Sequence, residues 1–353
     1  MKLKDIQSSV EKLIKFQIKN KKYSSIMIWG PPGIGKSSII KELSEKLEIG
    51  FVDVRLSQLA PTDLRGLPSV NKEENTLSWV PPNFLPRNKK SKGILFLDEF
   101  NMATGSMQGI AQELILDRRV GDYTLPDGWV IIAAGNRAED RAAVNTLPAP
   151  VANRFIHFSA NADLEEFKDL MYNYFDFSDK TKTSIIGFLN FRPELLFNNV
   201  SSSKDMAFPT PRSWEMAGNL IDMDIDISHA VGENTAVQYK AYNKICSKLP
   251  DIDTIMSGDS AESINAQDPS IVTAIVSSLV SHCKDPIHYT NSICWLINQK
   301  ITEDYIGLFI KDSILKLNSD QAKLAEVIGE IMKNENTKEF IKKYQSLVIN
   351  FGK

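Results

Sequence analysis

The segment from Gly30 to Ser37 constrains the fold more than any other part of the chain. Its sequence, GPPGIGKS, fits the pattern G-x-x-x-x-G-K-[ST] of loops that wrap around phosphate groups. An apolar run, Ile26 to Trp29, stands directly before it, and a run compatible with a helix, Ser38 to Leu47, follows it. A strand, a glycine-rich loop and a helix in this order predict a nucleotide site at the carboxyl end of a strand.

The residue types in this loop suit the chemistry of phosphate binding. Glycines let the backbone approach phosphate oxygens, and successive amide groups with the following helix N-terminus direct positive dipole at an anion. Lys36 can reach the outer phosphates, and the hydroxyl of Ser37 can bind Mg²⁺. The candidate nucleotide-binding residues are therefore Gly30, Pro31, Pro32, Gly33, Ile34, Gly35, Lys36, Ser37 and Ser38.

The length, charge and cysteine content of the chain limit which classes of protein it can belong to. A chain of 353 residues predicts two or three domains, and 42% hydrophobic residues are enough for a sizeable core. With a net charge of −3, the chain lacks the excess of basic residues that is typical of a nucleic-acid-binding protein. The three cysteines have no zinc-like spacing, no signal-like segment opens the chain, and no apolar run is long enough for a membrane span. We therefore expect a cytoplasmic protein without a membrane segment.

The first half of the chain alternates apolar strands with helical patterns. The continuous apolar character of the strands predicts a parallel sheet that is buried between helices on both faces, an α/β fold. The candidate strands are Ile26–Trp29, Phe51–Val54, Ile94–Leu97, Val130–Ala133 and Phe155–Phe158, with a helix near Ser106–Leu116.

Two connections in this half are unusual. Residues 56–92 carry many prolines and the alternating run Thr76 to Val80, which predicts an insertion that contains a hairpin or loop. Residues 118–129 hold turn signals at Gly121-Asp122 and Asp127-Gly128, which flank a short run and predict a second hairpin.

Beyond about Ala160 the pattern is helical throughout. Apolar residues at helical spacing predict helices over Leu164–Phe175, Thr181–Phe191, Ser213–Ile221 and Ala230–Ser247, and a further helical group from Ile271 to Phe351. The segment Pro250 to Asp268 is rich in Asp, Ser and Gly and has the composition of a linker.

Polar residues follow two of the predicted strands. Asp98 and Glu99 end the apolar run that starts at Ile94, where Asp98 can hold Mg²⁺ and Glu99 can deprotonate a water that attacks the γ-phosphate. Solvated acids at a strand end are the alternative. Asn136 follows the next strand and can bind the γ-phosphate or the water, or it can be a plain turn residue.

Two arginines complete the set of candidates. Arg154 precedes the fifth strand, where it can stabilise transition-state charge at a neighbouring subunit's nucleotide or form a surface salt bridge. Arg212 begins a helix after Pro211, where it can reach the phosphates from a second domain or bind nothing.

The order of these parts resembles the AAA+ ATPases, and within them the MoxR-like branch with its CbbQ- and NorQ-type activators. The resemblance covers about residues 20–250. The motifs that carry it are GPPGIGKS at Gly30, LFLDEFNMA at Leu95, the segment Asp63–Pro68, AAGNRAED at Ala133, LPAPVANRF at Leu147 and FPTPRSW at Phe208.

The resemblance implies a P-loop core over 1–160 with an insert in helix 2 (56–92) and a pre-sensor hairpin (118–129), a helical lid over 161–250 and a C-terminal helical region over 251–353. It implies that Asp98 and Glu99 form the Walker B pair, that Asn136 and Arg212 are the two sensors, and that Arg154 is the arginine finger. Arg137 and Arg141 also lie near the implied subunit boundary, so the choice among the three arginines stays open. Met102 replaces a cation of the family motif.

The resemblance further implies a hexamer that hydrolyses ATP with Mg²⁺ and remodels or activates a protein partner, often one with a von Willebrand factor A domain. Two alternatives remain: a nucleotide-gated scaffold with little turnover, and a DNA-linked NTPase motor, which the acidic charge balance disfavours.

Overall fold

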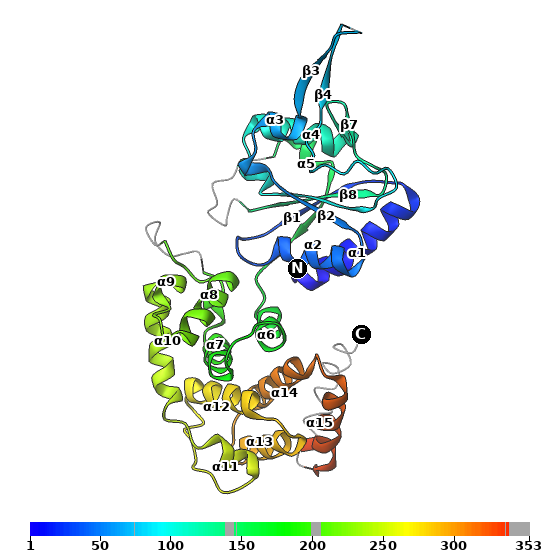
Figure 1. The fold of residues 1–353 in the computed structure, drawn as a ribbon. Coiled ribbons are helices and arrows are strands. Elements are labelled where there is room, and N and C mark those ends of the chain that lie inside the picture. The colour runs from blue at the N-terminus through cyan, green and yellow to red at the C-terminus, as the bar shows by residue number, and fades with distance from the viewer. Residues whose placement is uncertain (74, 138–144, 146, 199–205, 336, 339–353) are drawn as a thin grey trace. The chain divides into compact units, whose positions relative to one another are not determined.

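The computed structural model describes the chain except for residues 74, 138–144, 146, 199–205, 336 and 339–353. It divides into two compact units, Met1–Ala162 and Asp163–Lys353 (Figure 1), which are described separately below. The three-part division at residues 160 and 250 stays a prediction.

A parallel five-stranded sheet forms the centre of the N-terminal unit. Its strands lie in the order β2 (Gly50–Arg55), β5 (Gly93–Asp98), β8 (Trp129–Gly135), β1 (Ser25–Trp29) and β9 (Phe155–Ser159). All five strands expected from the apolar runs are present, and the α/β fold class is confirmed. Because every pair is parallel, all carboxyl ends of the strands meet at one edge of the sheet.

Helices cover both faces of this sheet, as Figure 1 shows for the N-terminal unit. Alternate residues of β5 explain why: Ile94 and Phe96 pack with α1 (Leu3–Asn20) and α2 (Lys36–Lys46), whereas Leu95 and Leu97 pack with α4 (Gly105–Asp117). Full burial of each such side chain stabilises the fold by roughly 1.5–3 kcal/mol. The basic α1 turns an apolar stripe and the polar Gln17 inward, and its lysines stay on the solvated side.

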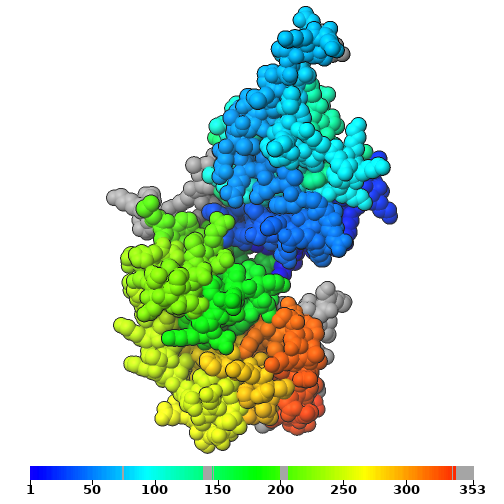
Figure 2. Space-filling view, in the orientation of Figure 1, coloured from blue at the N-terminus to red at the C-terminus, as the bar shows by residue number. Residues whose placement is uncertain are grey.

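Two hairpins interrupt the alternation of strands and helices. The short helix α3 (Pro61–Arg65) leads into β3 (Leu67–Asn71) and β4 (Thr76–Val80), and β6 (Arg119–Val120) pairs with β7 (Tyr123–Thr124). Figure 2 shows the β3–β4 hairpin standing out from the surface of the N-terminal unit. Four large apolar side chains on it are more than half exposed: Leu67, Val70, Leu77 and Val80.

The C-terminal unit is helical. Its elements are α6 (Leu164–Asn173), α7 (Asp179–Phe191), α8 (Pro211–Asp222), α9 (Ser228–Val231), α10 (Glu233–Cys246), α11 (Ile252–Ser257), α12 (Pro269–His282), α13 (Pro286–Asn298), α14 (Glu303–Leu317) and α15 (Gln321–Lys333). The helix α12 is central and packs against α7, α10 and α14. Within the described part of the chain, no helix has both the length and the apolar character that crossing a bilayer requires.

Two sequence predictions for this unit were wrong. The single helix expected over 230–247 is broken at Gly232, which has φ +82°, and a β carbon there would lie 2.6 Å from the carbonyl oxygen of Ala207. The expected linker over 250–268 contains α11, because Ile255 and Met256 are buried in the same core as α12 and α13. Both errors arise from tertiary contacts that outweigh local composition.

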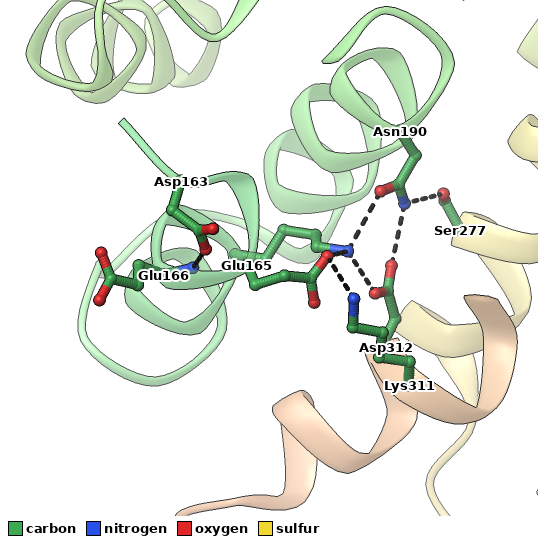
Figure 3. Close-up of polar contacts among 8 residues, drawn as sticks. Asp163, Glu165, Glu166, Asn190, Ser277, Lys311 and Asp312 are labelled. Atoms are coloured by element: carbon green, nitrogen blue, oxygen red, sulfur yellow. Dashed lines mark hydrogen bonds and ion pairs between the residues drawn. The ribbon is translucent and has the colours of Figure 1, made fainter. Parts of the chain in front are cut away.

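A buried ion pair ties three helices of this unit together (Figure 3). The ammonium of Lys168 on α6 lies 2.5 Å from Asp312 on α14, and both side chains are fully buried. Lys168 also contacts Glu165 at 2.9 Å and Asn190 of α7 at 3.2 Å. Burial opposes the charge of Lys168, but the carboxylates of Asp312 and Glu165 together outweigh it and raise its pKa.

Candidate functional site

Three adjacent strands bring most of the predicted site residues to one place. The loop Gly30–Ser37 follows β1, Asp98 ends β5, and Asn136 follows β8, which lies between β1 and β5. Because parallel strands end at the same edge, residues far apart in sequence meet here. The first contact is a hydrogen bond from the amide of Gly30 to the carbonyl oxygen of Gly135, at 3.2 Å.

The ammonium of Lys36 lies inside the loop. It donates to the carbonyl oxygens of Gly30 and Pro31, at 2.8 and 2.9 Å, and to the amide oxygen of Asn136 at 3.1 Å. The side chain is only 9% exposed. These three oxygens are neutral, so a phosphate group offers the ammonium a stronger, charged acceptor.

The loop conformation depends on glycine at two positions. Gly33 and Gly35 have φ +75° and +101°, which residues with a β carbon resist. Gly35 is also the N-cap of α2, and no side chain caps that helix. The first amide groups of α2 therefore point toward the loop without a side-chain acceptor at the cap, which favours an anion there.

Ser37 and Asp98 have the geometry of a shared cation site. The hydroxyl of Ser37 donates to a carboxylate oxygen of Asp98 at 2.7 Å. Burial raises the pKa of Asp53 on the neighbouring strand β2, and the negative charge of Asp98 raises it further. A cation between Ser37 and Asp98 would relieve this concentration of negative charge. Hydroxyl and carboxylate oxygens are ligands that Mg²⁺ accepts, together with phosphate oxygens and water, so the residues fit the metal.

No denser metal centre is present in the parts of the chain that the structure describes, where no three His, Cys, Asp or Glu side chains gather.

Glu99 is held by a residue that the motifs did not indicate. The hydroxyl of Ser57, in the turn after β2, donates to the carboxylate of Glu99. Glu99 itself has φ +53°, a left-handed conformation that is uncommon outside glycine. Its amide donates to Asp98 at 2.8 Å. The sequence contains no signal for Ser57, because only the sheet order places the end of β2 beside the end of β5.

Asn101 is the second residue that sequence reasoning missed as part of the site. It is 2% exposed, its amide nitrogen donates to the carbonyl oxygen of Asn136 at 2.7 Å, and its amide oxygen accepts from the Asn136 backbone N–H at 3.1 Å. This two-point contact fixes the backbone of Asn136, whose side chain meets Lys36. Met102, next in the chain, accepts a weak bond from the Asn136 side chain at 3.5 Å.

Arg154 lies at the opposite edge of the sheet from the loop. It directly precedes β9, whose Phe155 pairs with Ser25 at the start of β1, while Ser159 pairs with Trp29 at its end. Roughly 13 Å of strand therefore separate Arg154 from the loop of its own chain. The side chain is exposed. This position does not suit a role at the chain's own nucleotide.

The other arginines are placed differently. Arg137 follows β8 on the loop side and donates to the side chain of Asn161 at 3.0 Å. Arg141 lies outside the described residues. Arg212 is exposed in the first turn of α8, in the C-terminal unit, where Thr210 and Ser213 form a capping box.

A comparison with protein families gives one match. Residues 25–155 match the AAA domain of the dynein-related subfamily. This segment spans β1 to the start of β9 and includes the loop, Asp98, Glu99, Asn136 and Arg154. No curated protein matches the chain.

Solved structures resemble the chain only weakly. A RuvB mutant of Thermotoga maritima is 14% identical, with 77% of this chain and 80% of that chain covered and a TM-score of 0.39. The RuvB Holliday junction branch migration motor of the same organism is 14% identical, with 78% of this chain and 81% of that chain covered and a TM-score of 0.37. A putative ATPase from Cytophaga hutchinsonii is 12% identical, with 92% of this chain and 88% of that chain covered and a TM-score of 0.32. At these TM-scores, no argument about activity follows from the likeness.

Proposed function

We propose that this AAA+ ATPase works as a ring of six copies, in which ATP hydrolysis with Mg²⁺ remodels or activates a protein partner. ATP binding and ATPase activity belong to the AAA domain in residues 25–155. Proteins of this family commonly oligomerise. The ring of six, the protein partner and the residue roles below are the proposal, in which residues 1–160 form the core, 161–250 the lid and 251–353 a further helical region.

Each residue at the carboxyl edge has a role in phosphoryl transfer. The loop Gly30–Ser38 binds the phosphates through its backbone N–H groups, which Pro31 and Pro32 lack, and Lys36 moves from neutral oxygens to the outer phosphates. Ser37 and Asp98 hold Mg²⁺, which neutralises charge on the phosphate oxygens. Glu99 leaves Ser57, orients a water and accepts its proton, while Asn136 positions that water or the γ-phosphate.

The observation that carries this proposal is the contact of the loop with the carboxyl ends of two other strands, β5 and β8. Ser37 meets Asp98 at 2.7 Å and Lys36 meets Asn136 at 3.1 Å. The same contacts also serve a nucleotide-gated scaffold, in which Glu99 turns over little ATP. Hydrolysis itself must separate the two.

The Glu99→Gln variant provides that test. We expect it to bind ATP as well as the original chain does and to lose turnover by roughly 10²-fold or more, because the amide cannot accept the proton of the water. Ser57→Ala is the companion variant, which frees Glu99 and should retain hydrolysis. Steady-state phosphate release and a fluorescent ATP analogue measure the two effects. Unchanged turnover in Glu99→Gln would refute the assignment.

The position of Arg154 supports assembly as part of the mechanism. An arginine at the amino edge of the sheet can stabilise transition-state charge only in another copy, and such a contact contributes roughly 10³-fold or more to turnover. Arg154→Ala should therefore be nearly inactive. Mixing it with Lys36→Ala should restore part of the activity, because some interfaces then pair an intact loop with an intact arginine. An absence of rescue argues against Arg154 and favours Arg137 or Arg141.

The β3–β4 hairpin favours a protein partner over DNA. Its exposed Leu67, Val70, Leu77 and Val80 offer apolar contact area, and its turn carries Lys72 beside Glu73 rather than a cluster of cations. Exposed apolar patches mark protein contacts, whereas DNA contacts need basic residues. A partner with a von Willebrand factor A domain follows from the resemblance to the MoxR-like branch.

Capture with a trapped variant tests the partner. Glu99→Gln loaded with ATP should retain a von Willebrand factor A domain protein from the same cells, and Val70→Ser/Leu77→Ser in that background should lose it. The substitution Ser8→Ala, at an exposed position of α1, is the control. Salt-dependent binding of duplex DNA, with no protein retained, would instead support the DNA-linked motor.

A further inference from the structure

A cavity opens at the amino edge of the sheet, away from the phosphate loop. Its volume is about 270 Å³, and its lining includes Gln17, Tyr23, Ser24, Arg118 and Arg154. These residues come from α1, from the segment that leads into β1, from the end of α4 and from the turn before β9. A bulk water occupies about 30 Å³, so the cavity holds a small polar group with water around it.

Arg118 supplies a positive charge to the cavity wall. Its guanidinium donates to the carbonyl oxygens of Pro126 and Trp129, at 2.9 and 2.7 Å, and lies 3.9 Å from the centre of the Tyr23 ring. Burial lowers its pKa. Among the described residues Arg118 forms no ion pair. The negative charge of Asp127 acts on Arg118 electrostatically, but the carboxylate of Asp127 pairs with Lys21 at 3.3 Å. Arg118 thus lacks a carboxylate of its own.

Two buried donors accompany this charge. Gln17 is 2% exposed, and its amide oxygen accepts from the backbone N–H of Ser24 at 3.0 Å. Its amide nitrogen has no acceptor within the described part of the chain, and neither has the hydroxyl of Tyr23. A buried donor without an acceptor costs roughly 1–3 kcal/mol, so an acceptor that enters the cavity removes this cost.

We propose that this cavity binds an oxyanion, a carboxylate or a phosphate group, between Arg118, Arg154, Gln17 and Tyr23. Arg154 also forms no ion pair among the described residues, and no carboxylate lines the cavity. The wall therefore presents two cations and two unpaired donors. The oxyanion is either a free small anion or the acidic side chain of a second copy of this chain. The proposal does not depend on the ring or on ATP hydrolysis.

Calorimetric titration with inorganic phosphate and with acetate, at constant ionic strength, tests the first source. The Lys36→Ala background removes phosphate binding at the loop. In it we expect saturable heat, and Gln17→Glu should weaken the affinity by at least about tenfold. This variant keeps the acceptor for Ser24 but places a carboxylate beside Arg118. Tyr23→Phe, which keeps the ring, should weaken it less.

The substitution Asn20→Asp is the matched control, because it makes the same charge change at an exposed position of α1. An equal loss of affinity in Asn20→Asp would mean that net charge, rather than the cavity, sets the binding, and would overturn the proposal.

Sedimentation across a range of protein concentrations tests the second source. If free anions give no heat but Gln17→Glu weakens self-association by at least about tenfold, the oxyanion belongs to another copy. If neither anion binds and self-association is unchanged in Gln17→Glu and Tyr23→Phe, the proposal is wrong. Normal ATP turnover in such a chain would leave the proposed function intact.

Discussion

Two buried lysines, one in each unit, contact oxygens of different kinds. Lys36 in the phosphate loop donates to two carbonyl oxygens and the amide oxygen of Asn136. Lys168 on α6 lies between the carboxylates of Asp312 and Glu165. Those three oxygens are uncharged and are weaker acceptors than a phosphate group, whereas Lys168 has two carboxylates as built-in counter-charges.

A third lysine separates the effect of burial from that of the partner. The ammonium of Lys316 on α14 donates to the carbonyl oxygens of Val280, Ser281 and Cys283, at the C-terminal end of α12. Burial lowers its pKa to about 8, whereas the carboxylates around Lys168 raise the pKa there. The charge of the partner, rather than the depth of burial, therefore decides whether such a lysine favours its charged form.

The largest effect on stability should come from Lys168→Met. It leaves Asp312 as a buried carboxylate without its cation, which costs about 3–5 kcal/mol of unfolding free energy. Urea denaturation of the full chain measures this loss. The double variant Lys168→Met/Asp312→Leu should recover a large part of it, since both charges are then absent. A double variant as unstable as the single one would show that packing, not charge, holds the helices together.

Lys36→Met should lower ATP turnover strongly and stability little, unlike Lys168→Met, whose main effect is on stability. Loss of the ammonium that meets the phosphates should lower turnover by about 10²–10³-fold, a cost comparable to that of removing one transition-state donor. Its neutral partners can bind water, so we expect the urea midpoint without nucleotide to stay close to that of the original chain. A marked loss of stability in Lys36→Met would remove the contrast with Lys168.

A pH series tests the third lysine. The folded pKa of Lys316, about 8, lies below its unfolded value near 10.4. Between these values the unfolded chain binds more protons, so the unfolding free energy should rise with pH, by at most about 3 kcal/mol from this group. The difference between the original chain and Lys316→Met isolates the effect from other titrating groups. A flat difference from pH 8 to 10 would contradict it.

The smallest effect should come from Lys311→Met. Lys311 pairs with Glu165 at 3.2 Å, but its side chain is 33% exposed. Water screens such a pair, so we expect a loss of less than about 1 kcal/mol. Together with Lys168→Met this variant compares two lysines that share one carboxylate. A loss as large as that of Lys168→Met would make Glu165, rather than Asp312, the important partner.

Much of the N-terminal unit could be predicted because its signals are local. The continuous apolar run Ile94–Leu97 predicts a strand with both faces buried, and the structure has that strand. The loop Gly30–Ser37 needs glycine at fixed positions, which the sequence shows directly. The C-terminal unit was less predictable. Gly232 lies inside a helical pattern but adopts a conformation that ends one helix and starts the next, and only its contact with Ala207 accounts for this.

The candidate site divides in the same way. The types and order of Lys36, Ser37, Asp98, Glu99 and Asn136 could be read from the chain, because phosphate and metal chemistry restrict which residues can serve. Ser57 and Asn101 could not, since a serine in a turn and an asparagine after an acidic pair have many uses. Their roles depend on which strand ends lie next to each other.

The sequence by itself determined the nucleotide loop, the five strands and the set of residues that phosphoryl transfer needs, because glycine, lysine and carboxylates act there through local chemistry. Only the tertiary structure decided how these residues are held: Glu99 by Ser57, the backbone of Asn136 by Asn101, and Arg154 at the far edge of the sheet. It also decided that Lys168 is neutralised by Asp312, 144 residues later in the chain. Such pairings require the chain to be folded, since no local pattern specifies which distant oxygen a buried cation will meet.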